Sequence, residues 1–270
     1  MPLGLGAQMG KGGIVKSIPS HVTDNLKMLH RYNLSSVVPV SDGAVYLSGV
    51  DNNEAPIEIA DNASLDFGTG DFSICFWMMQ PSVSDNNGAK ICIKKVNDTI
   101  IANPGFTIHI NGTGIRSSIW DGDSGANLDV ASLFLNDAKW EHFAFVYDRD
   151  TALNIYVDGV LKTPNTTLAS HTGSFDNSET FDIGYYADTN YLKAYMCNFG
   201  VWKGALTQAQ IKSIMWKNYA GLTDSDKDAG ATGSSNLSAW WNMDVETATD
   251  GTSGSGGIKD SHGTNHGDLS

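Results

Sequence analysis

The feature that most constrains this chain is a series of short runs in which apolar and other residues alternate. The alternating apolar residues are Phe72, Ile74, Phe76 and Met78; Phe106, Ile108 and Ile110; Phe143, Phe145 and Tyr147; and Leu153, Ile155 and Val157. A period of two is the repeat of a β-strand that turns one face to a core. Clusters of turn-forming residues, such as 67–71, 84–90 and 121–127, separate the runs. The pattern predicts an all-β fold of the β-sandwich type.

One short helix is expected after the last strand of this sandwich. Thr207 is a suitable N-cap, and Gln210 three residues later completes a capping box. The residues predicted to face the sandwich are Leu206, Ile211, Ile214 and Met215. The next segment, 221–236, is polar and rich in glycine and serine, which predicts a linker.

These patterns divide the chain into three parts. Residues 1–42 form a predicted extended N-terminal arm, in which Val22, Leu26 and Leu29 indicate a short helix. Residues 43–220 form the sandwich, and 221–270 form the linker and a C-terminal return strand. That last strand either folds back as an edge strand, which we favour, or belongs to a detached second repeat. It could instead pair with a neighbouring subunit, because unpaired strand edges are templates for pairing.

Charge is distributed unevenly along the chain, whose formal net charge is −13. The first 41 residues contain four cations, Lys11, Lys16, Lys27 and Arg31, against Asp24 alone, so the remaining residues carry −16. An acidic body argues against nucleic acid as a partner. The four cations are candidates for anchoring the arm on an acidic partner.

The N-terminal residues and the cysteines bear on the compartment. The opening 16 residues contain no apolar run long enough for a secretory signal, and no stretch has the length of a membrane span. The three cysteines do not suggest a disulfide framework, and Cys75 and Cys197 lie in apolar runs typical of buried thiols. We therefore expect synthesis in the cytoplasm and no membrane insertion.

Three stretches together resemble the laminin-G-like, concanavalin A-like lectin/glucanase superfamily. They are DNASLDFGTGDFSICFWMM at 61–79, KWEHFAFVYDRDTALNIYVDGVLKT at 139–163, and FDIGYYADTNYLKAYMCNFGVWKGALTQAQI at 181–211. The resemblance covers about residues 43–217 and implies a two-sheet antiparallel jelly roll. Residues 237–267 are similar to a segment that commonly opens such a domain, although here they come last.

Glucanases of this superfamily use carboxylates at alternate positions of one strand, and the sequence contains no such set. Asp148 and Asp150 have the spacing but flank Arg149 in a predicted turn, whereas Glu58 falls in a loop-like segment. Hydrolase motifs with an activated serine or a zinc site are also absent from the sequence. We therefore predict that the chain is not an enzyme. His109 and His142 occupy the polar phase of their strands and are expected to face solvent.

Calcium is a candidate ligand, because lectins with this jelly roll often hold it at the rim of the sandwich with oxygen ligands. The candidate ligands lie in oxygen-rich loops and are Asp51, Asn52, Asp121, Asp123 and Asp260. The family's F-D-G turn before the first site reads LSG here, with Ser48 in the aspartate position. That departure weakens the case for a family-type site.

Carbohydrate binding requires aromatic rings on accessible positions beside hydrogen-bonding groups. The candidates are Trp120, Asp121, Tyr185, Tyr186, Asp188 and Tyr191. The tryptophans assigned instead to the core or to helix–sheet packing are Trp77, Trp140, Trp202 and Trp216.

Laminin-G-like domains that carry a glycine-rich arm and no export signal are similar to virion proteins of bacteriophages. The resemblance implies a non-catalytic structural or decoration protein, assembled in the host cytoplasm and displayed on the particle. Its expected partners are capsid or tail proteins bound through the arm, further copies in a homo-oligomer, and a cell-surface glycan. The alternatives are a secreted-type lectin or accessory module of a glucan hydrolase, and an assembly protein that binds no sugar. Fold alone does not decide among them.

Overall fold

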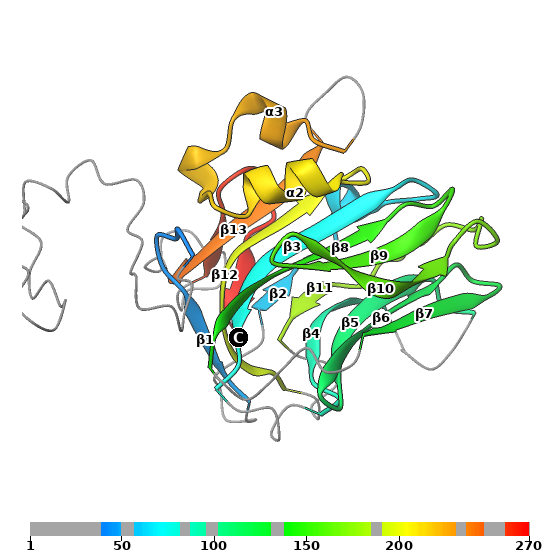
Figure 1. Ribbon diagram of the computed structural model, residues 1–270, viewed down its shortest axis with the longest axis horizontal. Coiled ribbons are helices and arrows are strands. Elements are labelled where there is room, and N and C mark those ends of the chain that lie inside the picture. Colours follow the sequence, from blue (N-terminus) through cyan, green and yellow to red (C-terminus); the bar gives the residue numbers. More distant parts are fainter. Residues whose placement is uncertain are drawn as a thin grey trace, which may run out of the picture. The chain divides into compact units, whose positions relative to one another are not determined.

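The structure is a computed structural model of the chain, and it describes residues 39–49, 57–81, 87–95, 102–130, 138–184, 191–230, 236–245 and 257–269. Within these residues, 15 strands form one hydrogen-bonded sheet that folds over into two layers, with 14 strands on one path and β1 paired beside β12 (Figure 1). Neighbouring strands are antiparallel. The predicted all-β jelly-roll sandwich is therefore confirmed.

Each layer contains strands from distant parts of the sequence. The first layer contains, in spatial order, β10 (Val160–Thr167), β9 (Ala152–Val157), β8 (Trp140–Tyr147), β3 (Phe72–Met79), β12 (Lys193–Trp202) and β13 (Leu237–Val245), with β1 (Val45–Ser48) beside β12. The path continues through β14 (Ile258–Asp260) and β15 (Gly267–Leu269) into the second layer: β2 (Ile57–Ile59), β11 (Phe181–Ile183), β4 (Lys90–Lys94), β5 (Gly105–Asn111), β6 (Gly114–Trp120) and β7 (Gly125–Val130).

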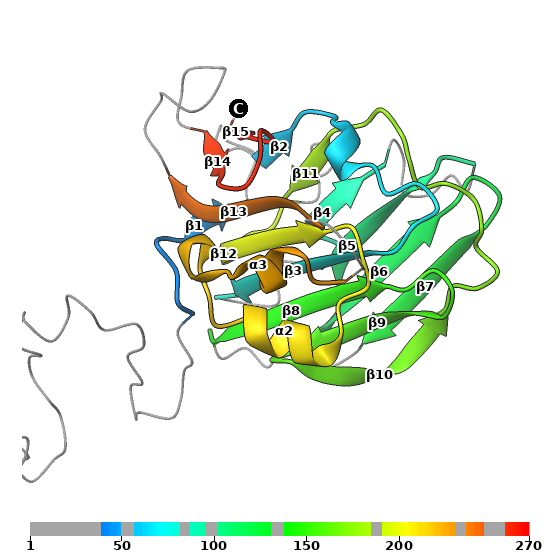
Figure 2. The same cartoon turned by 90° about the horizontal axis from the view of Figure 1, so that it is seen from above.

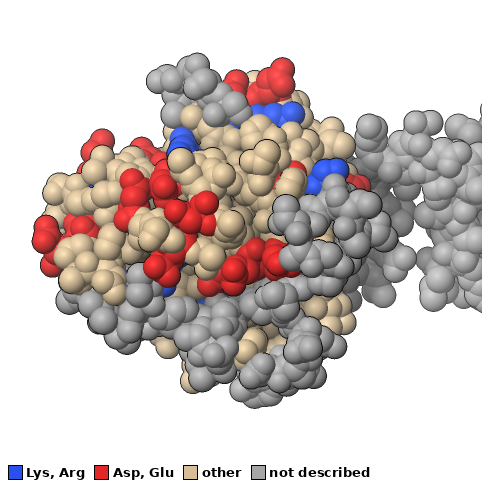
Figure 3. Space-filling model, turned by 180° about the vertical axis from the view of Figure 1, so that it is seen from behind, with Lys and Arg blue, Asp and Glu red and all other residues tan. Residues whose placement is uncertain are grey.

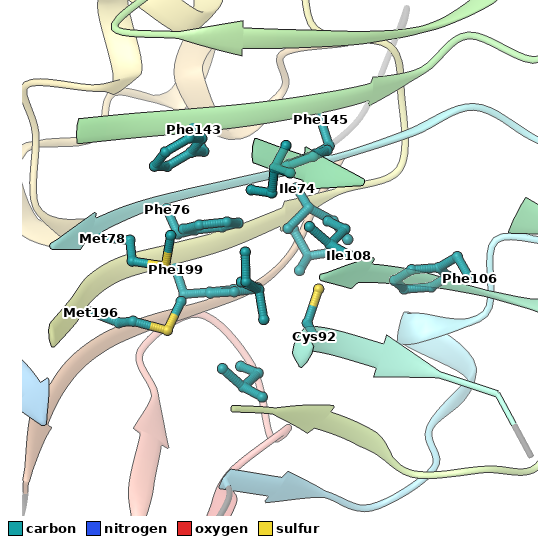
Figure 4. Close-up of a cluster of buried hydrophobic side chains, with 14 of the residues drawn as sticks. Ile74, Phe76, Met78, Cys92, Phe106, Ile108, Phe143, Phe145, Met196 and Phe199 are labelled. Atoms are coloured by element: carbon teal, nitrogen blue, oxygen red, sulfur yellow. The ribbon is translucent and has the colours of Figure 1, made fainter. Parts of the chain in front are cut away.

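The core lies between the layers and is filled by the alternating residues that the sequence identified. Phe76 of β3 stacks on Phe143 of β8 and on Phe199 of β12, with ring centroids 5.7 and 5.2 Å apart. Phe106 and Ile108 of β5 approach from the opposite layer (Figure 4). Because these rings have no contact with water, their burial is the main contribution to stability.

A second apolar cluster covers the outer face of the first layer, which explains why β3 is buried on both faces. Figure 2 shows α2 (Gln208–Ile214) and α3 (Asp224–Lys227) above this layer. Ile211 and Ile214 of α2 pack into the same cluster as Cys75, Ala144 and Trp202 of the sheet. All three cysteines of the chain are buried, and none of them forms a disulfide. The strand pattern predicted one buried face, and the helices supply the second.

The start of α2 confirms the predicted cap. The Thr207 side chain accepts a hydrogen bond from the Gln210 amide at 3.3 Å, and the Gln210 side chain accepts one from the Thr207 amide at 2.8 Å. This reciprocal pair satisfies two backbone donors that the first turn leaves free.

The segment predicted as a linker is instead folded over residues 219–230. It contains the turn η2 (Tyr219–Gly221) and α3, which Thr223 caps. Asp226 is buried, and its carboxylate accepts hydrogen bonds from Lys217, Ser213 and Thr223. The prediction of a linker was wrong for residues 221–230, because capping and hydrogen bonds, together with the burial of Leu222 and Ala229 in the second apolar cluster, fold this segment.

The C-terminal return strand is an inner strand and not the edge strand that we favoured. β13 pairs with β12 through Trp241 and Phe199, and with β14 through Trp241 and Asp260. The segment therefore folds back onto its own sandwich and completes it.

The predicted N-terminal helix and the four anchoring cations fall at 1–38, outside the described residues. The helices in the described part of the chain are all too short or too polar to cross a membrane.

Candidate functional site

Among the described sugar-binding candidates, only Trp120 lies on a strand, on the outer face of β5, β6 and β7. Along β6, Ile115 and Ile119 belong to the core, so Arg116, Ser118 and Trp120 occupy the opposite face. Cross-strand register places Thr107 and Asn127 on either side of Ser118. The polar residues of this face differ in exposure: Thr107 and Ser118 are buried, at 0% and 2% exposed, whereas Asn127 is exposed and Trp120 is half-buried.

Trp120 sits between two glycines. Gly105 of β5 and Gly125 of β7 are its direct cross-strand partners. A Cβ atom on Gly125 would lie 2.7 Å from Cδ1 of Trp120, so the absence of a side chain there is what allows the ring to lie over β7. The ammonium of the buried Lys95 lies 4.6 Å from the ring centroid, a cation–π distance. The ring is half-buried and has a defined position on the sheet.

The accessible groups beyond Trp120 are hydrogen-bonding side chains. Arg116 donates to Asp129 through Nε and Nη2, at 2.7 and 2.8 Å, and Asn111 donates to the same carboxylate at 2.8 Å. The hydrogen bond from Arg116 is the main cause that lowers the pKa of Asp129 below its usual value. Asn127 is exposed between this pair and the tryptophan. The face therefore combines an aromatic ring, an amide and a fixed ion pair.

Asp121, predicted for both sugar and calcium, has a structural role instead. Its Oδ1 accepts hydrogen bonds from the amides of Asp123 and Ser124, and its Oδ2 accepts one from Gly173. Burial raises the pKa of Asp121, but these hydrogen bonds outweigh it and lower the pKa below its usual value. The carboxylate closes the β6–β7 turn and ties it to the loop that contains Gly173, so it is not presented to a ligand.

Asp260 is likewise committed to the fold. It is 2% exposed, and its oxygens accept hydrogen bonds from the amides of Trp240 at 3.0 Å, His262 at 2.9 Å and Asn265 at 3.0 Å. It ends β14, whereas Asp121 and the exposed Asp123 follow β6, several strands away. In the described ranges, no three His, Cys, Asp or Glu side chains form a group suited to a metal ion. Among the described calcium candidates, Asp121 and Asp123 share one turn, and Asp260 lies apart from them.

Several candidates lie outside the described residues. These are Asp51, Asn52, Tyr185, Tyr186 and Asp188. Tyr191 is described and half-buried just before β12.

Two side chains differ from their predicted environments. His142 was expected to face solvent but is 2% exposed, because the Trp77 ring packs edge-on against it at 5.4 Å. Burial lowers the pKa of His142 to about 3, so its imidazole is neutral at physiological pH. Trp216 was assigned to packing but is 42% exposed, although it contacts Trp77 with ring centroids 5.3 Å apart. A polar strand phase does not predict exposure to solvent when a ring from a neighbouring strand packs over the side chain.

A family model described as "Concanavalin A-like lectin/glucanases superfamily" matches residues 51–212, more than half of the chain. The chain belongs to this superfamily. The match begins after β1 and ends within α2, so it leaves out β1 and the C-terminal strands β13, β14 and β15.

Solved structures of several binding proteins share the superfamily fold with this chain. A provisionally assigned carbohydrate binding protein from Bacteroides ovatus aligns at 17% identity and TM-score 0.55, over 83% of this chain and 58% of its own. The binding domain of botulinum neurotoxin serotype G aligns at 17% identity and TM-score 0.51, over 67% of this chain and 48% of its own. The binding domain of Paraclostridial Mosquitocidal Protein 1 aligns at 15% identity and TM-score 0.50, over 65% of this chain and 47% of its own. At these identities the likeness shows the fold alone. No curated protein matches the chain.

Because the superfamily includes glucanases, the carboxylates on the sheet are relevant. The search along single strands missed a row that the register creates: Asp182 of β11 lies directly opposite Glu58 of β2, which lies opposite Asp268 of β15. Burial raises the pKa of Asp182 to about 6, and the negative charges of Glu58 and Glu179 contribute to the shift. The Oδ1 atom of Asp182 is buried and has no hydrogen-bond partner. No pattern within one segment could have revealed a row of residues from three distant segments.

Proposed function

We propose that the chain is a non-catalytic carbohydrate-binding module whose ligand lies on the outer face of β5–β7. The observation that carries this proposal is the position of Trp120, held over Gly125 and followed along the strands by exposed hydrogen-bonding groups. A pyranose ring has C–H groups on its face and hydroxyls around its edge. An aromatic face and adjacent polar groups match both.

Asn127 and Asp129 extend the site along β7. Alternate residues of a strand are about 7 Å apart, so Trp120 and these two side chains can contact successive parts of one ligand. Both are exposed, and Arg116 holds Asp129 in place. The names of the Bacteroides ovatus protein and of the neurotoxin binding domain indicate that this fold serves binding in those proteins.

Binding to a glycan array tests the proposal. Trp120→Ala should weaken binding about tenfold, because it removes one ring contact and the area that this contact buries. Trp120→Phe keeps an aromatic ring and should retain most of the affinity. Leu161→Ala is a matched control, because Leu161 is an exposed apolar side chain of the other layer. Equal binding by the native chain and Trp120→Ala would reject this face as the site.

The Glu58–Asp182 pair is the observation that favours the alternative, glycan hydrolysis. We favour binding because the Oδ1 atom of Asp182 is inaccessible, so this carboxyl does not present both oxygens to a substrate. Release of reducing ends from β-glucans decides the question. Activity that Asp182→Asn and Glu58→Gln each abolish would show that the chain is an enzyme.

We also propose that the module is displayed on a bacteriophage particle as a homo-oligomer, attached through its N-terminal arm. The first 50 residues lie outside the family match, and the first 41 carry a net positive charge while the rest of the chain is acidic. Antibodies to the chain should label intact particles, and a chain that lacks residues 1–38 should fail to attach. Recovery of the chain only in the particle-free fraction of a lysate would contradict this location.

A further inference from the structure

A row of large side chains crosses four strands on the outer face of the first layer, on the opposite side of the molecule from Trp120. Register places Tyr46 of β1 opposite Tyr195 of β12, Tyr195 opposite Met79 of β3, and Met79 opposite Trp140 of β8. We call these four residues the aromatic row. With adjacent strands about 4.8 Å apart, it is about 14 Å long.

The aromatic row is accessible because α2 ends before reaching it. Tyr46 is 44% exposed, and Tyr195, Met79 and Trp140 are only partly buried. Two residues earlier along β3, Trp77 is fully buried, and its Nε1 donates a hydrogen bond to the Met215 carbonyl at the end of α2. The helix therefore seals one end of this sheet face and leaves the other open, with Trp216 at the boundary.

The two tyrosine rings of the row pack against each other. The rings of Tyr46 and Tyr195 lie 4.6 Å apart with an interplanar angle of 33°. Aromatic side chains that are already packed lose little conformational freedom when they bind a ligand. Ser48 follows on the same face, and its hydroxyl oxygen is buried without a hydrogen-bond partner.

The size of the row decides between a protein and a smaller ligand. Since a large aromatic side chain has about 150–250 Å² of surface, the exposed parts of the row and Trp216 total on the order of 300 Å². A stable protein interface needs about 800 Å² per partner, so a second copy of the chain is not the occupant that this row fits.

Charge narrows the class of ligand further. Residues 42–270 carry a net charge of −16, and the space-filling view from behind shows many Asp and Glu and few Lys and Arg side chains on the face it displays (Figure 3). Such a body repels anionic chains, including nucleic acids and acidic polysaccharides. A linear surface one side chain wide fits a neutral chain of sugar rings.

We infer that the aromatic row is a second carbohydrate-binding surface, which takes a neutral linear oligosaccharide across β1, β12, β3 and β8. The inference rests on the proposed function only for the general class of ligand. The residues of the aromatic row are separate from the Trp120 face. Two surfaces on opposite sides would make one chain bivalent, so that it links two glycan strands.

Calorimetric titration with cellohexaose, maltohexaose and, as the anionic counterpart, hexagalacturonate tests the inference. The native chain should bind a neutral hexasaccharide and not hexagalacturonate. Tyr46→Ala/Tyr195→Ala removes two ring contacts and should weaken binding at the aromatic row at least tenfold, so that the number of hexasaccharides bound per chain falls from two to one. Tyr46→Phe/Tyr195→Phe keeps the rings and should bind nearly as the native chain does.

Val160→Ala/Leu161→Ala is the matched control, because both side chains are exposed on the same layer. It should bind as the native chain does, and thermal unfolding should show all variants folded. If only Trp120→Ala weakens binding, the aromatic row is not a site and the proposed function stands. If only the tyrosine variant weakens it, the row is the site and the Trp120 face is not. Failure of the native chain to bind either neutral hexasaccharide overturns the inference.

Discussion

The outer faces of the two layers differ in what covers them. On the first layer, α2 and α3 bury Cys75, Ala144 and Trp202 in a second apolar cluster. On the second layer, β6 and β7 present Arg116, Asn127 and Asp129 to solvent. On both outer faces, the residues are those that alternate with core-facing residues along their strands. Alternation alone therefore does not show which of the two faces is covered. The exposure of an outer face depends on whether a later segment of the chain packs over it. The parts that no segment covers are the candidates for binding.

The largest expected effect comes from removing a ring beneath the helices. Trp202 is fully buried, contacts the Trp240 ring at 5.9 Å and donates to the Asp226 carbonyl. Trp202→Ala should lower the free energy of unfolding by about 3–5 kcal/mol through the cavity it leaves. Trp120→Ala on the other face should cost less than about 1 kcal/mol. Urea unfolding of both variants measures the difference, and equal losses would contradict the contrast between the faces.

A smaller effect is expected where the chain passes between the layers. Asp260→Ala leaves the buried amides of Trp240, His262 and Asn265 without their acceptor, which should cost about 3 kcal/mol. Asp260→Asn keeps the shape and one acceptor oxygen, so its loss should be smaller. Hydrogen exchange in β14 reports the local effect. Unchanged protection there in Asp260→Ala would show that the carboxylate is not what holds this connection.

The row of carboxylates on the second layer predicts a dependence on pH. Burial raises the pKa of Asp182 to about 6, well above the usual value of an aspartate, so the folded state favours its protonated form. Protonation of Asp182 stabilises the folded state fully below about pH 4, and this stabilisation is lost as the pH rises through 6. Asp182→Asn, which stays neutral, should therefore be more stable than the native chain by about 1–2 kcal/mol above pH 6, after allowance for partial exposure.

Below pH 4 that advantage should disappear. Thermal unfolding from pH 3.5 to 8 measures it, and a gain that does not vary with pH would contradict the ionisation argument. Glu58→Gln removes one of the charges that repel Asp182, so it should lower the pKa of Asp182 and shift the transition to lower pH.

The smallest expected effect concerns the cover of the first layer. Thr207→Ala removes the side-chain acceptor for the Gln210 amide at the start of α2 and should cost about 1 kcal/mol. Thr207→Ser retains the hydroxyl and should be nearly neutral. Chemical denaturation measures both. A loss as large as that of Trp202→Ala would mean that the cap, and not the packing, keeps the helix on the sheet.

The sequence predicted the sandwich and the capped helix because both depend on short-range patterns. The alternation of Phe72, Ile74 and Phe76 and the Thr207–Gln210 pair are local, and the structure confirms them. The Asp182–Glu58 pair and the aromatic row depend on strand register, which joins segments far apart in the chain. His142 was mispredicted for the same reason, since the Trp77 ring that buries it comes from another strand. Asp121 and Asp260 show that an oxygen-rich loop can be satisfied by its own backbone.

The pairing of β15 with β2 has a consequence for folding. β2 lies near the start of the described chain and β15 at its end, yet Ile59 pairs with Gly267 and Ile57 with Leu269. The ribosome must therefore synthesise the chain through β15 before this pairing can form, and until then the edge of β2 that pairs with β15 stays unpaired. Contacts between residues so distant in sequence slow folding. The interval between synthesis of β2 and of β15 is when the nascent chain most needs protection from aggregation.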